Sequence, residues 1–417
     1  MQWLYQLFIW LYPIIARIIS PVNKKAGLWV SGRIGLFNAI EKALNQNKHP
    51  IIWMHCASLG EFEQGLPVAE KLKTRFPNHK ILISFFSPSG YTVRKNHPIA
   101  DWVFYLPMDS NRNAALFLTI VRPSIALFIK YEFWYFYLKT LHQQKIPTLL
   151  VSGIFRNDHL FFKWYGGFYR NMLGYFNHLF VQDQPAYQLL QSIGYQAHSS
   201  ISGDTRFDRV LEIAQQAKPD EQLIAFCNHQ YVIVAGSTWL DDDKALQYFS
   251  QSNQQVKYII APHSVDETRI EACLSLYPNA VRYSNFIASP EHITAQTIVM
   301  DNMGMLSSLY QYASIAYIGG GFTKDGIHNS LEAAVYGIPL VFGPTYKKYR
   351  EAIELIEAKA AFTAKDASEI KYLLEDLRSN STKIKAAGKS AGDYVKSKNG
   401  ASNRILTYIQ ENRLLIN

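Results

Sequence analysis

The chain has few cysteines and few charged residues. Of its 417 residues, 18% are charged and only three are cysteine, at Cys56, Cys227 and Cys273. They stand singly, without the spacing of a zinc site or a disulfide framework, which fits a reducing compartment. No isolated Asp-x-Asp pair follows a predicted strand near the glycine-rich segment described below, and we interpret Asp241–Asp243 as a solvated face. We therefore expect neither a metal nor a resident cofactor.

Long basic tracts are also lacking. The formal net charge of +9 favours anionic partners, yet no arginine-rich run or nucleic-acid motif appears. We therefore expect no nucleic-acid partner. The charge instead favours a phosphorylated substrate or an anionic membrane face.

No apolar run reaches the roughly 20 residues that a membrane-spanning helix needs. The longest uncharged stretch is Met1–Ala16, within an aromatic and apolar segment that extends to Ile19. No basic region precedes it and no small-x-small site follows, so a signal peptide is not expected. The basic residues come afterwards: Arg17, Lys24, Lys25 and Arg33. We interpret the segment as a helix lying in a membrane interface, with the rest of the chain on the cytoplasmic side. A core helix docked on the first domain is the alternative.

The length indicates two domains. Short apolar runs alternate with helical stretches from Pro50 to Gly203, and the pattern restarts after the polar stretch Gln215–Gln222. This predicts an α/β protein with two Rossmann-like halves, each built on a parallel sheet, whose ligands bind in a cleft beyond the strand ends. We predict a membrane-associated helix over 1–22, a first domain over 23–205, and a second domain over 206–417 that ends in a helical tail.

The most informative segment begins at a triple glycine, Gly319–Gly321. An apolar run precedes it, a helix is predicted to open near Asn329, and a second apolar run follows. Bare backbone amides and a helix N-terminus favour bound phosphate, and Glu332 is placed to accept hydrogen bonds from sugar hydroxyls. The alternative is a structural turn with Glu332 as a surface acid. The His-Asn-x-Leu-Glu continuation favours a nucleotide-sugar site.

Three polar residues in or just after the first half are candidates for catalysis. Glu61 follows a strand and can act as a general base, although Ser58-x-x-Glu61 also matches a helix capping box. Glu132 closes another apolar strand, either as a second carboxylate in the cleft or as an acid in the first turn of a helix. Arg206 is placed to steady negative charge, or else is an ion-paired linker residue.

Two weaker patterns lie in the second half. Pro262-His263 follows a strand and could contact a base or a phosphate, with a surface turn as the alternative. In Met303-Gly304-Met305, Gly304 is expected to open a helix and offer amides to a base, or simply to start the helix.

Taken together, these residues resemble the Kdo (3-deoxy-D-manno-octulosonic acid) transferases of lipopolysaccharide synthesis, over essentially the whole chain. The family's H-x-x-S-x-G-E turn is matched by His55, Ser58, Gly60 and Glu61. Its E-x-W segment is matched by Glu132 and Trp134, and its K-F-D segment by Arg206-Phe-Asp208. Its nucleotide motifs are matched by Pro262, His263, Met303, Gly304, Met305, Asn329, Ser330, Leu331 and Glu332. This chain departs from the family's usual pattern at Arg206, His263, Met305 and Ile327.

The resemblance implies a GT-B fold and an inverting transfer of Kdo from CMP-Kdo to the lipid A precursor, lipid IVA, at the cytoplasmic side of the inner membrane. By that analogy Glu61 is the base, and Glu132 and Arg206 stabilise the transition state. The alternatives are another GT-B enzyme, such as a lipid-disaccharide synthase or a UDP-sugar epimerase, and a non-catalytic protein that binds a nucleotide sugar or a lipid.

Overall fold

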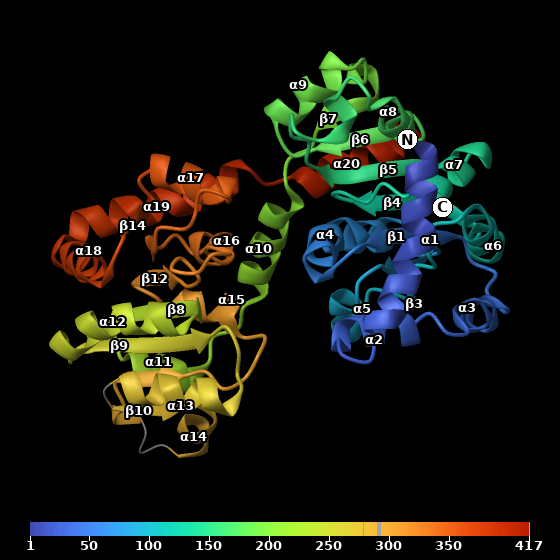
Figure 1. Ribbon diagram of the computed structural model, residues 1–417. Coiled ribbons are helices and arrows are strands. Elements are labelled where there is room, and N and C mark those ends of the chain that lie inside the picture. The colour runs from blue at the N-terminus through green and yellow to red at the C-terminus, as the bar shows by residue number, and fades with distance from the viewer. Residues whose placement is uncertain (278, 290–292, 417) are drawn as a thin grey trace. The chain divides into compact units, whose positions relative to one another are not determined.

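The chain folds into two compact units. The computed structural model describes residues 1–277, 279–289 and 293–416 (Figure 1). One unit comprises Met1–Arg209 and Asn399–Asn417, and the other comprises Val210–Lys398. The predicted order of two α/β halves is therefore present.

The first unit is built on a seven-stranded parallel sheet with the strand order β3-β2-β1-β4-β5-β6-β7. Its strands are β1 (Ile51–Cys56), β2 (Lys80–Phe85), β3 (Trp102–Tyr105), β4 (Pro123–Ile129), β5 (Thr148–Gly153), β6 (His178–Val181) and β7 (Ser199–Ile201). The parallel sheet is confirmed. The short edge strand β7 was not predicted, because three residues carry no clear apolar pattern.

Helices cover both faces of this sheet. They are α1 (Gln2–Ile19), α2 (Lys24–Ser31), α3 (Leu36–Leu44), α4 (Leu59–Arg75), α5 (Pro88–Arg94), α6 (Asn111–Val121), α7 (Tyr135–Gln143), α8 (Gly167–Leu173), α9 (Gln184–Ser192) and the first turn of α10 (Thr205–Gln216). Strand β1 is buried along its whole length, and its side chains alternate between two cores. Trp53 lies in the core beneath α3, α6 and α7, whereas Ile52 and Met54 lie in the core beneath α4.

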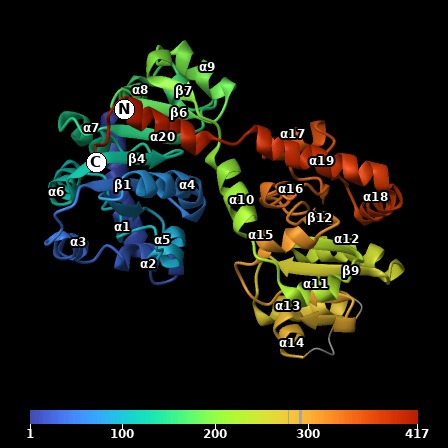
Figure 2. The same ribbon diagram turned by 180° about the vertical axis from the view of Figure 1, so that it is seen from behind.

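The C-terminal helix α20 (Ala401–Glu411) also belongs to the first unit (Figure 2). Ile405 and Ile409, one turn apart, lie in the same core as Ile52, against α4. The carboxylate of Asp208 accepts hydrogen bonds from the backbone amides of Gly400 (2.5 Å) and Ser402 (2.6 Å). The prediction that the whole helical tail belongs to the second domain is therefore wrong, because this helix has an apolar face that completes the first core.

The second unit has its own seven-stranded parallel sheet, with the order β10-β11-β9-β8-β12-β13-β14. Its strands are β8 (Tyr231–Thr238), β9 (Val256–Pro262), β10 (Ala280–Arg282), β11 (Thr297–Val299), β12 (Ile315–Ile318), β13 (Leu340–Phe342) and β14 (Ala361–Thr363). Its helices are the rest of α10 with α11 (Glu221–Cys227), α12 (Leu240–Ser252), α13 (Glu267–Leu276), α14 (Tyr283–Ala288), α15 (Leu306–Leu309), α16 (Leu331–Ala334), α17 (Arg350–Glu357), α18 (Ala367–Ser379) and α19 (Ser381–Ser397). The second parallel sheet is likewise confirmed.

Helix α1 lies on the first unit and leaves much apolar surface exposed. Ile9 and Ala16 are buried, whereas Trp3, Trp10 and Ile18 are 65%, 64% and 72% exposed. No helix among the described residues is long and apolar enough to cross a membrane. The helix thus docks on the domain through one face, as the alternative interpretation expected, and presents a second apolar face outward.

A buried hydrogen bond fastens α1 to the domain. The Tyr5 hydroxyl donates to the carboxylate of Asp109, which also accepts the amides of Phe136 and Tyr137, each at 3.0 Å. Asp109 is fully buried, and this burial raises the pKa of its carboxyl to about 6.

We expect Tyr5→Phe to lower the free energy of unfolding by about 1.5–3 kcal/mol at pH 8, where Asp109 is ionised, because a hydrogen bond to a charged group is lost. Urea denaturation measures this. Tyr12→Phe is the control on the same helix, since no described residue bonds the Tyr12 hydroxyl; equal losses in both variants would contradict the role of Asp109.

Candidate functional site

Glu61 lies just beyond the carboxyl end of β1, in the first turn of α4. Its side chain bends back, and Oε2 accepts hydrogen bonds from the amides of Ala57 and, at 3.2 Å, of Ser58. The capping interpretation is therefore correct for this oxygen. Both bonds that the described residues give Glu61 go to Oε2 and none goes to Oε1, so capping does not exhaust the carboxylate.

The environment of Glu61 favours its protonated form. Glu61 is only 9% exposed. Burial first, and then the nearby charge of Glu132, raise the pKa of Glu61 to about 8, against the lowering effects of the Ala57 amide and Lys130. A carboxyl group with a pKa near neutrality is well matched to general acid or base catalysis.

Glu132 sits in the turn between β4 and α7 and joins a buried polar network. Its Oε2 lies 3.0 Å from Nε2 of His55 and accepts a 2.7 Å hydrogen bond from Nε1 of Trp134. On its other side, Nδ1 of His55 lies 2.8 Å from the Ser84 hydroxyl at the end of β2. Because α7 begins only at Tyr135, the alternative that Glu132 is an acid in the first turn of a helix is wrong.

Arg206 is ion-paired in the first turn of α10. Its guanidinium lies 2.7 Å from the carboxylate of Asp204, so the paired interpretation is correct. The turn is fixed to α4, because Gln64 donates to Asp204 at 3.3 Å and its carbonyl accepts from the Thr205 hydroxyl at 2.5 Å. Arg206 is therefore anchored to the helix that carries Glu61.

Tyr131 marks the place where these groups meet. Burial raises the pKa of its hydroxyl; Glu61 raises it further, whereas Arg156 and Arg206 lower it. The charges of Glu61 and Arg206 thus both shift the pKa of Tyr131, which directly precedes Glu132 in the chain. Glu61 and Glu132 therefore act on each other, and Arg206 is joined to the helix of Glu61 through Asp204 and Gln64.

In the second unit, His263 forms part of an aromatic stack. Its ring stacks on Trp239 at a centroid distance of 4.5 Å and on His328 at 4.7 Å. Nε1 of Trp239 donates to Nε2 of His328 at 3.3 Å. These three residues follow β8, β9 and β12, so the sheet gathers them at one edge. Sequence reasoning missed Trp239 and did not pair His328 with His263.

The sequence predicts a row of bare backbone amides at the triple glycine, but the structure pairs two of them. The amide of Gly319 donates to the carbonyl of Gly236, and the amide of Gly320 donates to Asp242, both at 2.8 Å. A Cβ atom on Gly319 would lie 2.3 Å from the Ser237 carbonyl oxygen. Gly319 is thus required by close backbone packing beside β8, and Gly321 packs in the same way against the backbone of Gly343.

The acidic run Asp241–Asp243 is not the solvated face that was predicted. Asp242 and Asp243 are fully buried, and only Asp241 is exposed. Asp242 accepts the amide of Trp239 at 2.9 Å and the hydroxyl of Tyr317 at 2.8 Å, in addition to the Gly320 amide. The first turn of α12 faces inward at the end of β8, where Asp242 satisfies backbone amides and Asp243 pairs with Arg269 and accepts from the Tyr277 hydroxyl at 3.0 Å.

The helix predicted to open near Asn329 is a single turn, α16, preceded by Ser330 as its cap. So short a helix contributes little dipole, and binding of a phosphate at its start stays a prediction. The side-chain amide of Asn329 donates from Nδ2 to Oε1 of Glu332 at 2.9 Å. The side chains of Ser330 and Leu331 are buried in the protein.

Glu332 is close to the end of β8. Its charge raises the pKa of the buried Tyr310 hydroxyl, second to burial itself. A Cβ atom on Gly236 would lie 2.1 Å from that hydroxyl.

Gly304 lies in the loop before α15 at a φ of +96°, and the helix opens only at Leu306, so the expectation that Gly304 opens it is wrong.

The sequence has clear relatives. Residues 30–209 match the family model described as 3-deoxy-D-manno-octulosonic-acid transferase (kdotransferase). The 3-deoxy-D-manno-octulosonic acid transferase of Aquifex aeolicus is 27% identical over 347 residues, which is 81% of this chain and 89% of that protein. The enzyme of the same name from Rickettsia bellii is 26% identical over 354 residues, 81% of this chain and 82% of that protein.

The chain is thus similar to proteins of the Kdo transferase family, because the family model matches residues 30–209 and relatives at 26–27% identity align over most of the chain. This is a family of glycosyltransferases, and two parallel α/β units agree with the GT-B fold that the resemblance implied. A putative UDP-N-acetylglucosamine 2-epimerase from Listeria monocytogenes has a similar fold, with a TM-score of 0.60 over 87% of this chain and 96% of that protein. At 13% identity, that likeness concerns the fold alone.

The titration of Glu61 gives a test that does not depend on activity. Glu61→Gln keeps an oxygen for the two amides but removes the ionisable group. Because the pKa in the folded state is raised to about 8, the folded protein holds this proton more tightly than the unfolded chain does. Glu61 therefore adds stability at low pH that is lost as pH rises through that value.

We expect the wild type to lose stability relative to Glu61→Gln by up to about 1.4 kcal/mol per pH unit, over a window from about pH 5 to the folded-state pKa. Chemical denaturation of both proteins across this range measures the difference. Parallel stability curves would show that Glu61 ionises normally.

Proposed function

We propose that this protein is an inverting glycosyltransferase that moves Kdo from CMP-Kdo to a lipid A precursor such as lipid IVA. Its similarity to the Kdo transferase family supports the sugar and the reaction class. The observation that carries the proposal is Glu61: a buried carboxylate at a strand end, with a pKa raised to about 8 and one oxygen left over from capping.

The reaction is a single displacement. The acceptor hydroxyl oxygen forms a bond to the anomeric carbon of Kdo, and the bond from that carbon to the phosphate oxygen of CMP breaks. Glu61 takes the proton of the hydroxyl, and CMP leaves as a phosphate monoester anion. Attack opposite the leaving group inverts the anomeric centre.

Glu132 and Arg206 support this step in the proposal. The negative charge of Glu132 raises the pKa of Glu61 and so makes it a stronger base. Arg206, fixed by Asp204, supplies positive charge for the developing phosphate. In the second unit, His263 and Glu332 lie at the sheet edge where a nucleotide is bound in folds of this kind.

A membrane role accompanies the proposal. Trp3, Trp10 and Ile18 project from α1, and the first 40 residues contain Arg17, Lys24, Lys25 and Arg33 but no Asp or Glu. Such a helix suits the anionic cytoplasmic face of the inner membrane, where a lipid acceptor is found.

We expect Glu61→Gln to lower kcat/KM by about 10²–10⁴-fold, because the general base is lost, while CMP binding is retained. The assay uses CMP-Kdo and the tetraacylated precursor, with added sugars counted by mass spectrometry. Glu63→Gln is the matched control on α4, because Glu63 pairs with Arg94 and Arg209 and not with the site. Near wild-type turnover of Glu61→Gln would favour a capping role alone.

We expect the double variant Trp3→Asp, Trp10→Asp to reduce binding to phosphatidylglycerol vesicles at least tenfold, on the scale of two buried aromatic side chains. Vesicle sedimentation measures bound protein. Tyr248→Asp, at an exposed site in the second unit, is the control. Undiminished binding of the double variant would place the membrane contact elsewhere.

A further inference from the structure

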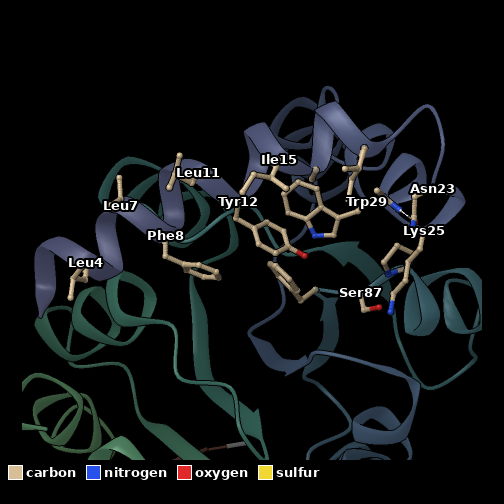
Figure 3. Close-up of a pocket in the computed structure, with 15 residues that line it drawn as sticks. Leu4, Leu7, Phe8, Leu11, Tyr12, Ile15, Asn23, Lys25, Trp29 and Ser87 are labelled. Atoms are coloured by element: carbon tan, nitrogen blue, oxygen red, sulfur yellow. Dashed lines mark hydrogen bonds between the residues drawn. The ribbon is translucent and has the colours of Figure 1, made fainter.

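An open apolar groove of about 690 Å³ runs along α1 in the first unit (Figure 3). Leu4, Phe8, Tyr12 and Ile15, which share one face of the helix, form one wall, and Trp29 and Phe86 complete it. The rings of Tyr12, Trp29 and Phe86 pack on one another, with centroids 5.1–5.8 Å apart. The groove is therefore held open by packed aromatic rings, and its size is within the range of ligand sites, roughly 300–1,000 Å³.

The polar lining of the groove is concentrated at one end. Asn23, Lys25 and Ser87 lie there together (Figure 3), and among the described residues that line the groove only Lys25 is charged. An apolar groove that ends at the ammonium group of Lys25 complements a molecule with an acyl tail and an anionic head.

The polar end of the groove adjoins the turn that holds Glu61. The amide of Ser87 donates to the carbonyl of Ala57 at 2.7 Å, and the amide of Ala57 in turn donates to the Glu61 carboxylate. A Cβ atom on Gly90, in the helix that follows Ser87, would lie 3.1 Å from the carbonyl carbon of Ser58.

The apolar wall adjoins the second carboxylate. The ring of Phe86 packs on Trp134 with centroids 4.7 Å apart, and Trp134 donates to Glu132. One ring thus separates the groove from the His55–Glu132 network. Phe86 and Ser87 of the groove follow β2, whereas Glu61 follows β1 and Glu132 follows β4, and these three strands are neighbours in the sheet.

We propose that this groove binds an acyl chain of the acceptor lipid and so places its phosphorylated sugar head beside Lys25 and Ser87, next to Glu61. This rests on the proposed function and adds where the acceptor is held. General attachment to a bilayer does not need the groove, because Trp3, Trp10 and Ile18 lie outside it. Each CH₂ group of the acyl chain that the groove buries is expected to strengthen binding roughly fourfold.

Ala26 on α2 lines the groove and is half-buried, so Ala26→Phe fills it without changing charge. The matched control is Ala115→Phe on the exposed face of α6. Transfer is measured with the tetraacylated precursor and with its fully deacylated form, in detergent. We expect Ala26→Phe to lower the ratio of kcat/KM between the acylated and deacylated acceptors at least tenfold, and Ala115→Phe to leave this ratio within twofold of the wild type.

An unchanged ratio in Ala26→Phe, or equal losses with both acceptors, would overturn the proposal. Ala26→Leu serves if the Phe variant unfolds, as judged by its thermal midpoint. A tenfold reduction in that ratio with wild-type thermal stability supports the groove.

A binding measurement separates the groove from the reaction. Equilibrium binding is measured to the tetraacylated precursor and to phosphatidylglycerol vesicles that lack it. Weaker binding of Ala26→Phe to the precursor alone supports the proposal, whereas equal weakening toward the vesicles makes the groove a general membrane contact and overturns it. If the precursor binds in the groove but no Kdo is transferred, the proposed function fails while the groove assignment stands.

Discussion

One oxygen, Oε2 of Glu132, organises the first unit at the ends of its central strands. It is shared by His55 and Trp134, and it thereby ties β1 to the turn after β4. Through Ser84 the same network reaches β2. Burying a carboxylate is costly unless hydrogen bonds satisfy it, so these partners must be in place for the strand ends to pack. The charge of this carboxylate adds to the effect of burial on the pKa of Glu61, and Trp134, which donates to it, packs on Phe86 in the wall of the apolar groove.

In the second unit, the buried carboxylate of Asp242 holds a loop in place through hydrogen bonds, as buried carboxylates do in the first unit. It accepts two backbone amides and a tyrosine hydroxyl, and it fixes the glycine loop against the start of α12. Burial raises its pKa to about 6, as it does for Asp109. In both units a negative charge that looks dispensable in the sequence holds a loop at the strand ends, where ligands bind in folds of this kind.

The sequence predicts what depends on neighbours in the chain. Runs such as Ile51–Cys56 are apolar because parallel strands are covered on both faces, and this alone indicates the doubly wound sheets. Glu61 was found because it follows such a run directly. The link from His55 to Glu132, the stack of Trp239 with His263, and the burial of Asp242 join segments tens of residues apart. Their partners are set by the packing of the sheet, which no local pattern encodes.

The chain passes between the two units twice, and both passages are fastened near Asp208. That residue lies in the first turn of α10, and its carboxylate also caps the start of α20. During synthesis, Ile405 and Ile409 emerge only after the whole of the second unit, although the core that they fill lies against α4. A nascent chain therefore carries an N-terminal unit with an open apolar seam for the time needed to translate about 190 further residues. The core of the first unit is thus completed only after the second unit has been synthesised, when α20 can pack against α4.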